Sequence, residues 1–342
     1  MVCGPGSKPL LFALLLAVGG DPVVPVPTWV SYAAQARLAG GRPLPVPTLP
    51  GEGGVPDPAA LLEAVPRARA AGRDVRCVVV TLPDNPTGTI ASAATVRRLA
   101  EAARELDLVI VSDEIYCDLV FAPGDRAVSP AEFAPERTVV TTGLTKNLAL
   151  GGWRVGVARL PGGPLGRTVH ERLAAIASQV WSSTAAPVQA AAAYAFAEPR
   201  EVVDRVAASR RLHERVVRAV AGRVTATGAR LAPVRATCYL YPDFEPLRAR
   251  LSRAHGVAGG GELAALLARR HGVGVLPATA FGEPEDALRI RIATSRLYGE
   301  SEHERLAALT AADPLRLPWI ATSLDRVAAA FADLAGEPVP GS

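Results

Sequence analysis

The sequence predicts an α/β protein in which a large domain is built on a mostly parallel sheet and a smaller C-terminal domain is α+β. In the first half of the chain, short Val- and Ile-rich runs alternate with stretches of helical periodicity. This alternation is typical of buried parallel strands joined by helices. The length of 342 residues fits about two domains. We expect a large domain over residues 1–205 and a small domain over residues 206–342.

The N-terminal segment allows three interpretations. A glycine-rich stretch at residues 4–7 precedes an apolar run at residues 10–18. The run resembles a signal peptide, although it is too short to span a membrane. A P-loop is the second interpretation, but its spacing is absent and Pro9 follows Lys8. The third is a glycine-rich loop that opens a buried helix, whose free N–H groups would bind an anion.

Strand and helix signals then follow in order along the chain. Strands are predicted at residues 22–26, 75–81, 108–111 and 138–141, and helices at residues 59–71 and 93–106. A long charged helix over residues 201–218 is expected to link the domains, and residues 318–334 are expected to form a closing helix. The small domain has strand-like segments at residues 237–241 and 273–276 and helical segments at residues 262–270 and 300–312.

Composition argues against several classes of function. The 37 basic and 33 acidic residues leave a net charge of only +4, which is too small and too scattered to indicate nucleic-acid binding. We expect no membrane span. The four cysteines lie far apart and the five histidines lack a metal-binding spacing, so we expect neither a metal site nor a disulfide framework. A reducing, cytoplasmic compartment is the simplest interpretation.

Lysine is the most informative residue type because the chain almost avoids it. Of the 37 basic residues only Lys8 and Lys146 are lysine, and the others are arginine. An amine can lose its proton and act as a nucleophile, whereas a guanidinium cannot. The two lysines are therefore the first candidates for a chemical role.

Polar residues follow three of the predicted strands at the point where each strand ends. Asn85 follows the strand at 75–81, Asp113 and Tyr116 follow the strand at 108–111, and Lys146 follows the strand at 138–141 with Arg154 eight residues later. Taken singly, each is a common turn or a solvated residue. Because ligands bind at the carboxyl ends of parallel strands, their joint placement predicts one binding site.

These segments resemble the signatures of a known enzyme family. Asn-Pro-Thr-Gly at 85–88, Ser-Asp-Glu-Ile-Tyr at 112–116 and the Lys-x7-Arg-x-Gly segment from Lys146 to Gly156 are similar to those of the class I/II aminotransferases of the aspartate aminotransferase superfamily. The resemblance extends from about Gly4 to about Ala311. It implies the fold type I architecture of enzymes that depend on pyridoxal 5'-phosphate (PLP).

The resemblance also implies roles for residues around the cofactor ring. Lys146 would hold PLP as an internal aldimine and then shuttle the substrate proton. Asp113 would keep the pyridine nitrogen protonated, while Asn85 and Tyr116 would hydrogen-bond the phenolic oxygen. Trp29 would stack on the ring; core packing is its alternative role.

The phosphate and the substrate have their own implied ligands. The phosphate would be bound by the helix-opening loop, by a cation and by a threonine hydroxyl, from Gly6, Ser7, Lys8, Arg154 and either Thr142 or Thr145. Arg289 would bind the substrate α-carboxylate, together with Asn85 and Trp29. Arg291 lies two residues later on the same strand, so a different register remains open.

The implied function is transfer of an amino group from an amino acid to a 2-oxo acid by a ping-pong route, in a homodimer. A C–S β-lyase, an enzyme similar to aminocyclopropanecarboxylate synthase, and a PLP-binding protein without turnover are the alternatives, because the signatures hold the cofactor and do not select the reaction. The family has a further segment before the phosphate loop. The loop begins here at Gly4, which predicts either a misassigned start or a truncated chain.

Overall fold

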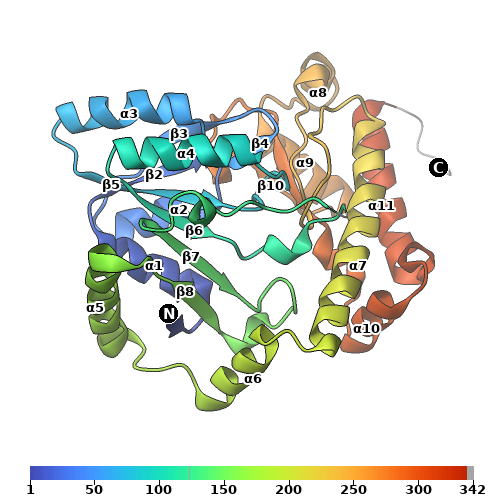
Figure 1. The fold of residues 1–342 in the computed structure, drawn as a ribbon. Helices are drawn as coiled ribbons and strands as arrows, with labels where there is room; N and C mark the ends of the chain where they lie inside the picture. The colour runs from blue at the N-terminus through green and yellow to red at the C-terminus, as the bar shows by residue number, and fades with distance from the viewer. Residues whose placement is uncertain (123, 337–342) are drawn as a thin grey trace.

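The computed structural model describes residues 1–122 and 124–336. Its larger part is built on an eight-stranded sheet in the order β1-β8-β7-β6-β5-β2-β3-β4 (Figure 1). The strands are β1 (Val2–Gly4), β2 (Asp21–Val26), β3 (Leu44–Leu49), β4 (Glu52–Pro56), β5 (Val75–Thr81), β6 (Val109–Asp113), β7 (Thr138–Gly143) and β8 (Gly156–Arg159). Neighbours from β3 through β7 pair in parallel, whereas the pairs β1–β8, β7–β8 and β3–β4 are antiparallel.

The register of the central strands places three strand ends side by side. Thr81 at the end of β5 pairs with Asp113 at the end of β6, and Asp113 pairs in turn with Thr141 of β7. These strands are rich in Val and Ile and nearly all of their residues are buried, as expected for strands covered on both faces. The sheet therefore delivers the segments that follow β5, β6 and β7 to one edge.

Helices cover both faces of the large sheet (Figure 1). One face packs against α3 (Pro58–Ala70) and α4 (Ala93–Glu105), and the other against α1 (Ser7–Val18), α2 (Val30–Leu38) and α5 (Gly163–Val180). The apolar run at residues 10–18 lies in α1, where Leu10, Leu11 and Leu14 are buried. This agrees with the third interpretation of the N-terminal segment, a glycine-rich loop that opens a buried helix.

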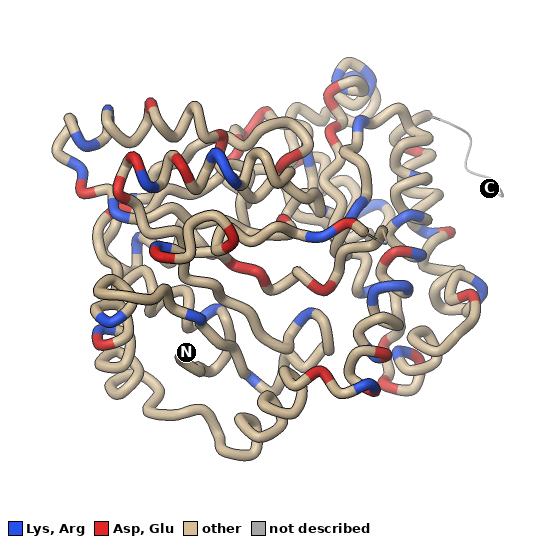
Figure 2. The backbone as a smooth tube through the Cα atoms, viewed as in Figure 1, with Lys and Arg blue, Asp and Glu red and all other residues tan. Residues whose placement is uncertain are grey.

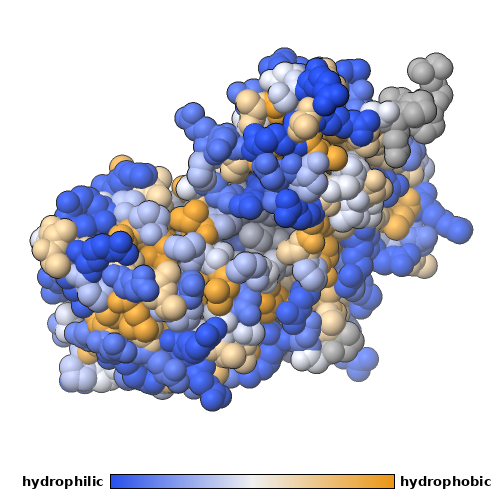
Figure 3. Space-filling view, turned by 90° about the horizontal axis from the view of Figure 1, so that it is seen from above, coloured by the Kyte–Doolittle hydropathy of each residue, from blue (hydrophilic) through white to orange (hydrophobic). Residues whose placement is uncertain are grey.

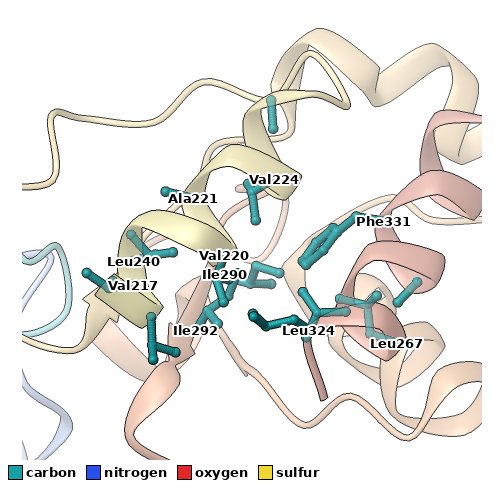
Figure 4. Close-up of a cluster of buried hydrophobic side chains, with 14 of the residues drawn as sticks. Val217, Val220, Ala221, Val224, Leu240, Leu267, Ile290, Ile292, Leu324 and Phe331 are labelled. Atoms are coloured by element: carbon teal, nitrogen blue, oxygen red, sulfur yellow. The ribbon is translucent and has the colours of Figure 1, made fainter. Parts of the chain in front are cut away.

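The C-terminal part has its own hydrophobic core around a three-stranded antiparallel sheet, in the order β10-β11-β9. Its elements are β9 (Tyr239–Leu240), β10 (Leu276–Pro277), β11 (Ile290–Ala293), α8 (Arg248–His255), α9 (Gly260–His271), α10 (Glu302–Thr310) and α11 (Pro318–Ala335). Figure 4 shows Val217, Val220 and Val224 of α7 (Arg200–Thr225) directed toward side chains of the sheet and of α11. The remaining helix, α6 (Ala186–Phe196), precedes α7.

Most predicted elements are found close to their expected bounds, including the closing helix, which is α11 and packs in the C-terminal core. Residues 273–276 contribute only Leu276 to a two-residue strand. The proposed division between residues 205 and 206 lies inside α7, a continuous helix of 26 residues. The domain boundary therefore stays a prediction.

The surface has no dominant charge of one sign. Basic and acidic residues are interspersed in Figure 2 and neither sign dominates a region of the backbone. The face seen in Figure 3 is mostly hydrophilic with scattered hydrophobic patches. Over the described residues, no helix is both long and apolar enough to cross a membrane. Within the same residues, no group of three or more His, Cys, Asp or Glu side chains could hold a metal ion.

Candidate active site

A cavity of about 340 Å³ lies where the carboxyl ends of β5 and β6 meet the segments that follow β2 and β7. Most of its walls come from the large sheet and its loops, while two residues come from the C-terminal part. It is lined by Ser7, Lys8, Trp29, Tyr32, Thr81, Asn85, Asp113, Ile115, Tyr116, Thr145, Lys146, Arg154, Tyr239 and Arg291. The structure thus brings together the polar residues that follow three separate strands.

Asp113 is the buried carboxylate of this cavity. Its Oδ2 accepts a hydrogen bond of 2.8 Å from the Tyr32 hydroxyl, which also lies 2.8 Å from the Thr81 hydroxyl. Burial raises the pKa of Asp113 to about 6, and the Tyr32 hydrogen bond, the Ile115 N–H and the charge of Lys146 oppose that rise. The carboxyl is therefore charged at neutral pH and suits a cationic partner in the cavity.

Lys146 follows β7 and lines the cavity together with Asp113 and Tyr116. Its Nζ is 5.7 Å from the centre of the Tyr116 ring. The Tyr116 hydroxyl is 3.1 Å from that of Tyr239, and the two rings meet edge to face. A half-buried amine with hydroxyl groups nearby can act as a nucleophile and as a proton carrier.

The start of α1 and Arg154 together form an anion-binding corner. Ser7 and Lys8 open the helix, so their N–H groups have no partner in the preceding turn. A Cβ on Gly6 would collide with the Arg154 guanidinium, and one on Gly156 would lie 2.9 Å from the Ser7 Cα. Glycine is needed at position 6 because its φ of 108° is disfavoured for other residues, and at position 156 because the backbone of the helix-opening loop approaches so closely.

Thr145 lines this cavity and Thr142 does not, so only one of the two predicted threonines reaches the site. Gly143, the last residue of β7, has no side chain that could add a hydroxyl to the site. A Cβ on Gly143 would lie 2.7 Å from the carbonyl oxygen of Val155. The close approach of the backbone before β8 therefore accounts for glycine at that position.

Arg291, and not Arg289, is the arginine in the cavity. Arg289 forms ion pairs with Glu283 and with Asp243, the latter at 3.5 Å, and does not line the cavity. The guanidinium of Arg291 lies 4.8 Å from the Tyr239 ring centre and donates a 3.1 Å hydrogen bond to the Asn85 Oδ1. Two carboxylates hold Arg289 elsewhere, so the structure places Arg291, the alternative register, at the cavity. Which of the two arginines binds the substrate stays a prediction.

Lys8 and Trp29 lie together at the exposed side of the cavity. The Lys8 Nζ is 4.9 Å from the centre of the Trp29 ring, and Lys8 is exposed. The Trp29 ring also meets Tyr32 edge to face, with centroids 5.2 Å apart. Trp29 is thus half-buried and borders the cavity, which fits a role in the site as well as packing.

Four residues of the cavity were given no role from the sequence: Tyr32, Thr81, Ile115 and Tyr239. Arg291 was named only as the alternative to Arg289. Thr81 and Ile115 lie at or near predicted strand ends, and this position indicates that a residue lines the site. Tyr32 and Tyr239 reach the site only through the packing of α2 and of the C-terminal sheet. Local sequence carries no signal for such contacts.

The family model for aminotransferases of class I and II matches residues 1–297. The chain belongs to this family. The aspartate aminotransferase of Geobacillus stearothermophilus is 32% identical over 301 residues, which cover 86% of this chain and 71% of that protein. A probable aspartate/prephenate aminotransferase of Thermus aquaticus is 40% identical over 182 residues, 52% of this chain and only 44% of that protein.

Solved structures of the family share the architecture described above. The aspartate aminotransferase of Thermus thermophilus with maleate is 28% identical and superimposes with a TM-score of 0.76 over 96% of this chain and 75% of that one. The class I/II member described here therefore has the predicted fold type I architecture, with a mostly parallel large sheet and a separate small antiparallel sheet.

Proposed function

We propose that this chain is a PLP-dependent aminotransferase that moves an amino group from an amino acid to a 2-oxo acid by a ping-pong route. The single observation that carries the proposal is the placement of Lys146, Asp113 and the anion-binding corner around one cavity. The names of the relatives favour transamination over a lyase, a cyclase or a protein without turnover.

The residues of the cavity fit PLP by charge and by donor type. The N–H groups of Ser7 and Lys8 with the Arg154 cation suit the phosphate dianion. Asp113 suits the protonated ring nitrogen, and Asn85 and Tyr116 suit the ring oxygen. Lys146 supplies the amine for covalent attachment. When bound, PLP supplies an electron sink that stabilises the carbanion left at the substrate Cα.

The protein's own residues then bind, orient and move a proton. Lys146 Nζ would accept the proton that leaves the substrate Cα, and in the reverse half-reaction it would return a proton to that carbon. Asp113 would keep a proton on the ring nitrogen, and Tyr32 holds Asp113 in place through its 2.8 Å hydrogen bond. Arg291 binds the substrate α-carboxylate through its guanidinium, with Asn85 holding that guanidinium in place.

We infer that the preferred substrates carry two carboxylates. Arg291 serves the first, and Lys8 is a second cation that lines the same cavity and takes part in no ion pair among the described residues. The backbone N–H of Lys8 is assigned to the phosphate. Its side-chain amine, which lies next to Trp29, suits the second carboxylate of the substrate. Names such as aspartate aminotransferase among the relatives support a dicarboxylic substrate.

We also propose a homodimer and a cytoplasmic location. Residues 181–197 carry no charged side chain, and this uncharged segment appears as an unbroken tan stretch in Figure 2. Val180, Tyr194 and Phe196 expose 65%, 54% and 43% of their surface, which suits a subunit interface. All four cysteines are free in the structure, which suits a reducing compartment. Sedimentation at several concentrations tests the dimer.

The function is tested by following both half-reactions with purified protein and PLP. Aspartate and glutamate as donors with 2-oxoglutarate and oxaloacetate as acceptors should yield the matching amino and oxo acids, identified by chromatography. A Lys146→Ala variant should yield none. Release of ammonia or of a sulfur leaving group in place of amino transfer would instead support a lyase, and no product from any donor would contradict the proposal.

A further inference from the structure

Asp84, next to the site residue Asn85, is a fully buried carboxyl with an uneven hydrogen-bond pattern. It lies in the turn after β5 and exposes 0% of its surface. Its Oδ2 accepts from the Thr87 backbone N–H at 3.1 Å and also from the Thr87 hydroxyl. No donor among the described residues reaches Oδ1. A buried carboxylate with an unsatisfied oxygen is costly, so its retention here needs a reason.

Strand β4 encloses this carboxyl. A Cβ on Gly54 would lie 3.1 Å from the Asp84 Oδ1, and one on Gly53 would collide with Oδ2. The Gly53 N–H donates to the Thr89 hydroxyl at 2.9 Å, and that hydroxyl lies 2.7 Å from the hydroxyl of Thr87. Asp84 is thus one end of a closed polar cluster that shapes the turn over residues 84–88.

The charged and titratable groups around Asp84 come from both parts of the chain. Burial raises the pKa of the Tyr32 phenol on α2 and of the Tyr241 phenol after β9, and the charge of Asp84 adds to each rise as the smallest of the contributions. Tyr32 hydrogen-bonds Asp113, and Tyr241 hydrogen-bonds Glu283, which pairs with Arg289. Burial raises the pKa of Asp84 to about 7, although the Thr87 hydrogen bonds and the Asn85 N–H oppose this.

The turn over residues 84–88 is connected directly to Arg291, the arginine proposed to bind the substrate. Asn85 is 3% exposed and follows Asp84 in the chain, and its Oδ1 accepts the 3.1 Å hydrogen bond from Arg291. The Arg291 Nε has no partner among the described residues, so Asn85 is a main polar restraint on that guanidinium. A change in the turn therefore changes how Arg291 is presented to the cavity.

We propose that Asp84 is a positioning residue for binding of the substrate carboxylate. It acts through Asn85, which orients the guanidinium of Arg291. The inference rests on the function proposed above. The charged form accepts strongly from both Thr87 donors and fixes the turn, so Asn85 holds Arg291 toward the cavity. The protonated form accepts more weakly and loosens the turn. The affinity for a carboxylate ligand therefore depends on pH through a residue that does not touch the ligand.

The test is calorimetric titration of succinate into the full chain with PLP, for wild type and Asp84→Asn, at pH 6 and pH 8. Succinate has two carboxylates and no amine, so it reports on binding without turnover. Other titrating groups are common to both proteins, and the ratio of the two dissociation constants isolates Asp84. We expect Asp84→Asn to bind within about twofold of wild type at pH 6 and about three- to tenfold more weakly at pH 8.

A second pair of variants keeps the test decisive if Asp84→Asn does not fold. Thr87→Val removes the hydroxyl donor and should weaken succinate binding at pH 8, whereas Thr87→Ser keeps the hydroxyl and should match wild type. Asp74→Asn, an exposed carboxyl, is the control for charge alone. A ratio that does not change with pH, equal losses in Thr87→Val and Thr87→Ser, or no binding to wild type would overturn the inference. If the pH-dependent ratio is found but no amino transfer occurs, the proposed function fails and the positioning role of Asp84 stands.

Discussion

Arg291 of the C-terminal sheet and Asn85 of the large sheet are joined by a 3.1 Å hydrogen bond from Nη1 to Oδ1. The bond connects strand β11 with the turn after β5, so the cavity is completed only when both parts of the chain fold. Arg289, two residues away, is held by Glu283 and Asp243 instead. Tertiary contacts, rather than the strand pattern, therefore decide which of the two arginines lines the cavity.

Replacing Arg291 separates these two arginines. Arg291→Ala should raise the dissociation constant for a carboxylate ligand by about ten- to a hundredfold, because a charge-assisted hydrogen bond is lost. Arg289→Ala should change that constant by less than about threefold. It should instead reduce the free energy of unfolding, because two ion pairs are lost, and only modestly, because the Arg289 side chain is partly exposed. The binding constants are measured by calorimetry, and a larger effect of Arg289→Ala would restore the original assignment.

Lys8 should set the preference for a second carboxylate. Lys8→Gln is expected to lower kcat/KM for aspartate by about tenfold, because one cation at the exposed side of the cavity is lost. Alanine, which has a single carboxylate, should be affected by less than about twofold. Arg200→Gln serves as the matched control, since its side chain is 93% exposed. Equal losses for aspartate and alanine would assign Lys8 to the phosphate rather than to the substrate.

The close approach of Gly156 to the loop of Gly6 and Ser7 predicts a specific loss of PLP affinity. Gly156→Ala places a Cβ against the helix-opening loop, so the phosphate site must open. We expect PLP affinity to fall by at least tenfold. Gly152→Ala is the matched control, because a Cβ there meets nothing within 4 Å. The affinities are compared by titrating PLP and following its absorbance, and similar values for the two variants would contradict the assigned phosphate site.

The titration of Asp84 predicts how stability depends on pH. Its pKa is about 7 in the folded chain and 3.8 ordinarily, so the folded state binds the proton more tightly than the unfolded state. Stability contributed by this group is therefore lost as pH rises from about 4 to 7. Asp84→Asn removes this loss. Its free energy of unfolding relative to that of wild type should therefore be higher at pH 8 than at pH 4 by on the order of 4 kcal/mol. Urea unfolding at both pH values measures this difference, and a constant difference would exclude a buried titrating carboxyl.

The sequence predicts the parts of the fold that depend on local pattern. Val- and Ile-rich runs identify β5, β6 and β7. The residues at or just after their ends, Asn85, Asp113 and Lys146, lie around one cavity as the rule of parallel sheets requires. Strands β3 and β4 carry no such pattern. β3 contains Pro45 and Pro47, and β4 contains two glycines. Only β4 lies at the edge of the sheet, while β3 pairs with both β2 and β4.

The pattern alone could not tell which arginine lines the cavity. Residues 289 and 291 are two apart on one strand segment, so a period of two places both on the same face. What separates them is the pair of carboxylates from Glu283 and Asp243, which the fold brings to Arg289. Tyr32 and Asp84 likewise acquire their roles through contacts with distant strands.

The measurement that tests the central claim most directly is the absorbance spectrum of the purified chain with PLP, compared with that of Lys146→Ala. We predict a visible band in wild type that is absent from the variant, that shifts to shorter wavelength when a dicarboxylic amino acid is added, and that returns with the matching 2-oxo acid. Identical spectra for wild type and Lys146→Ala would contradict the assignment of Lys146 as the residue that holds the cofactor.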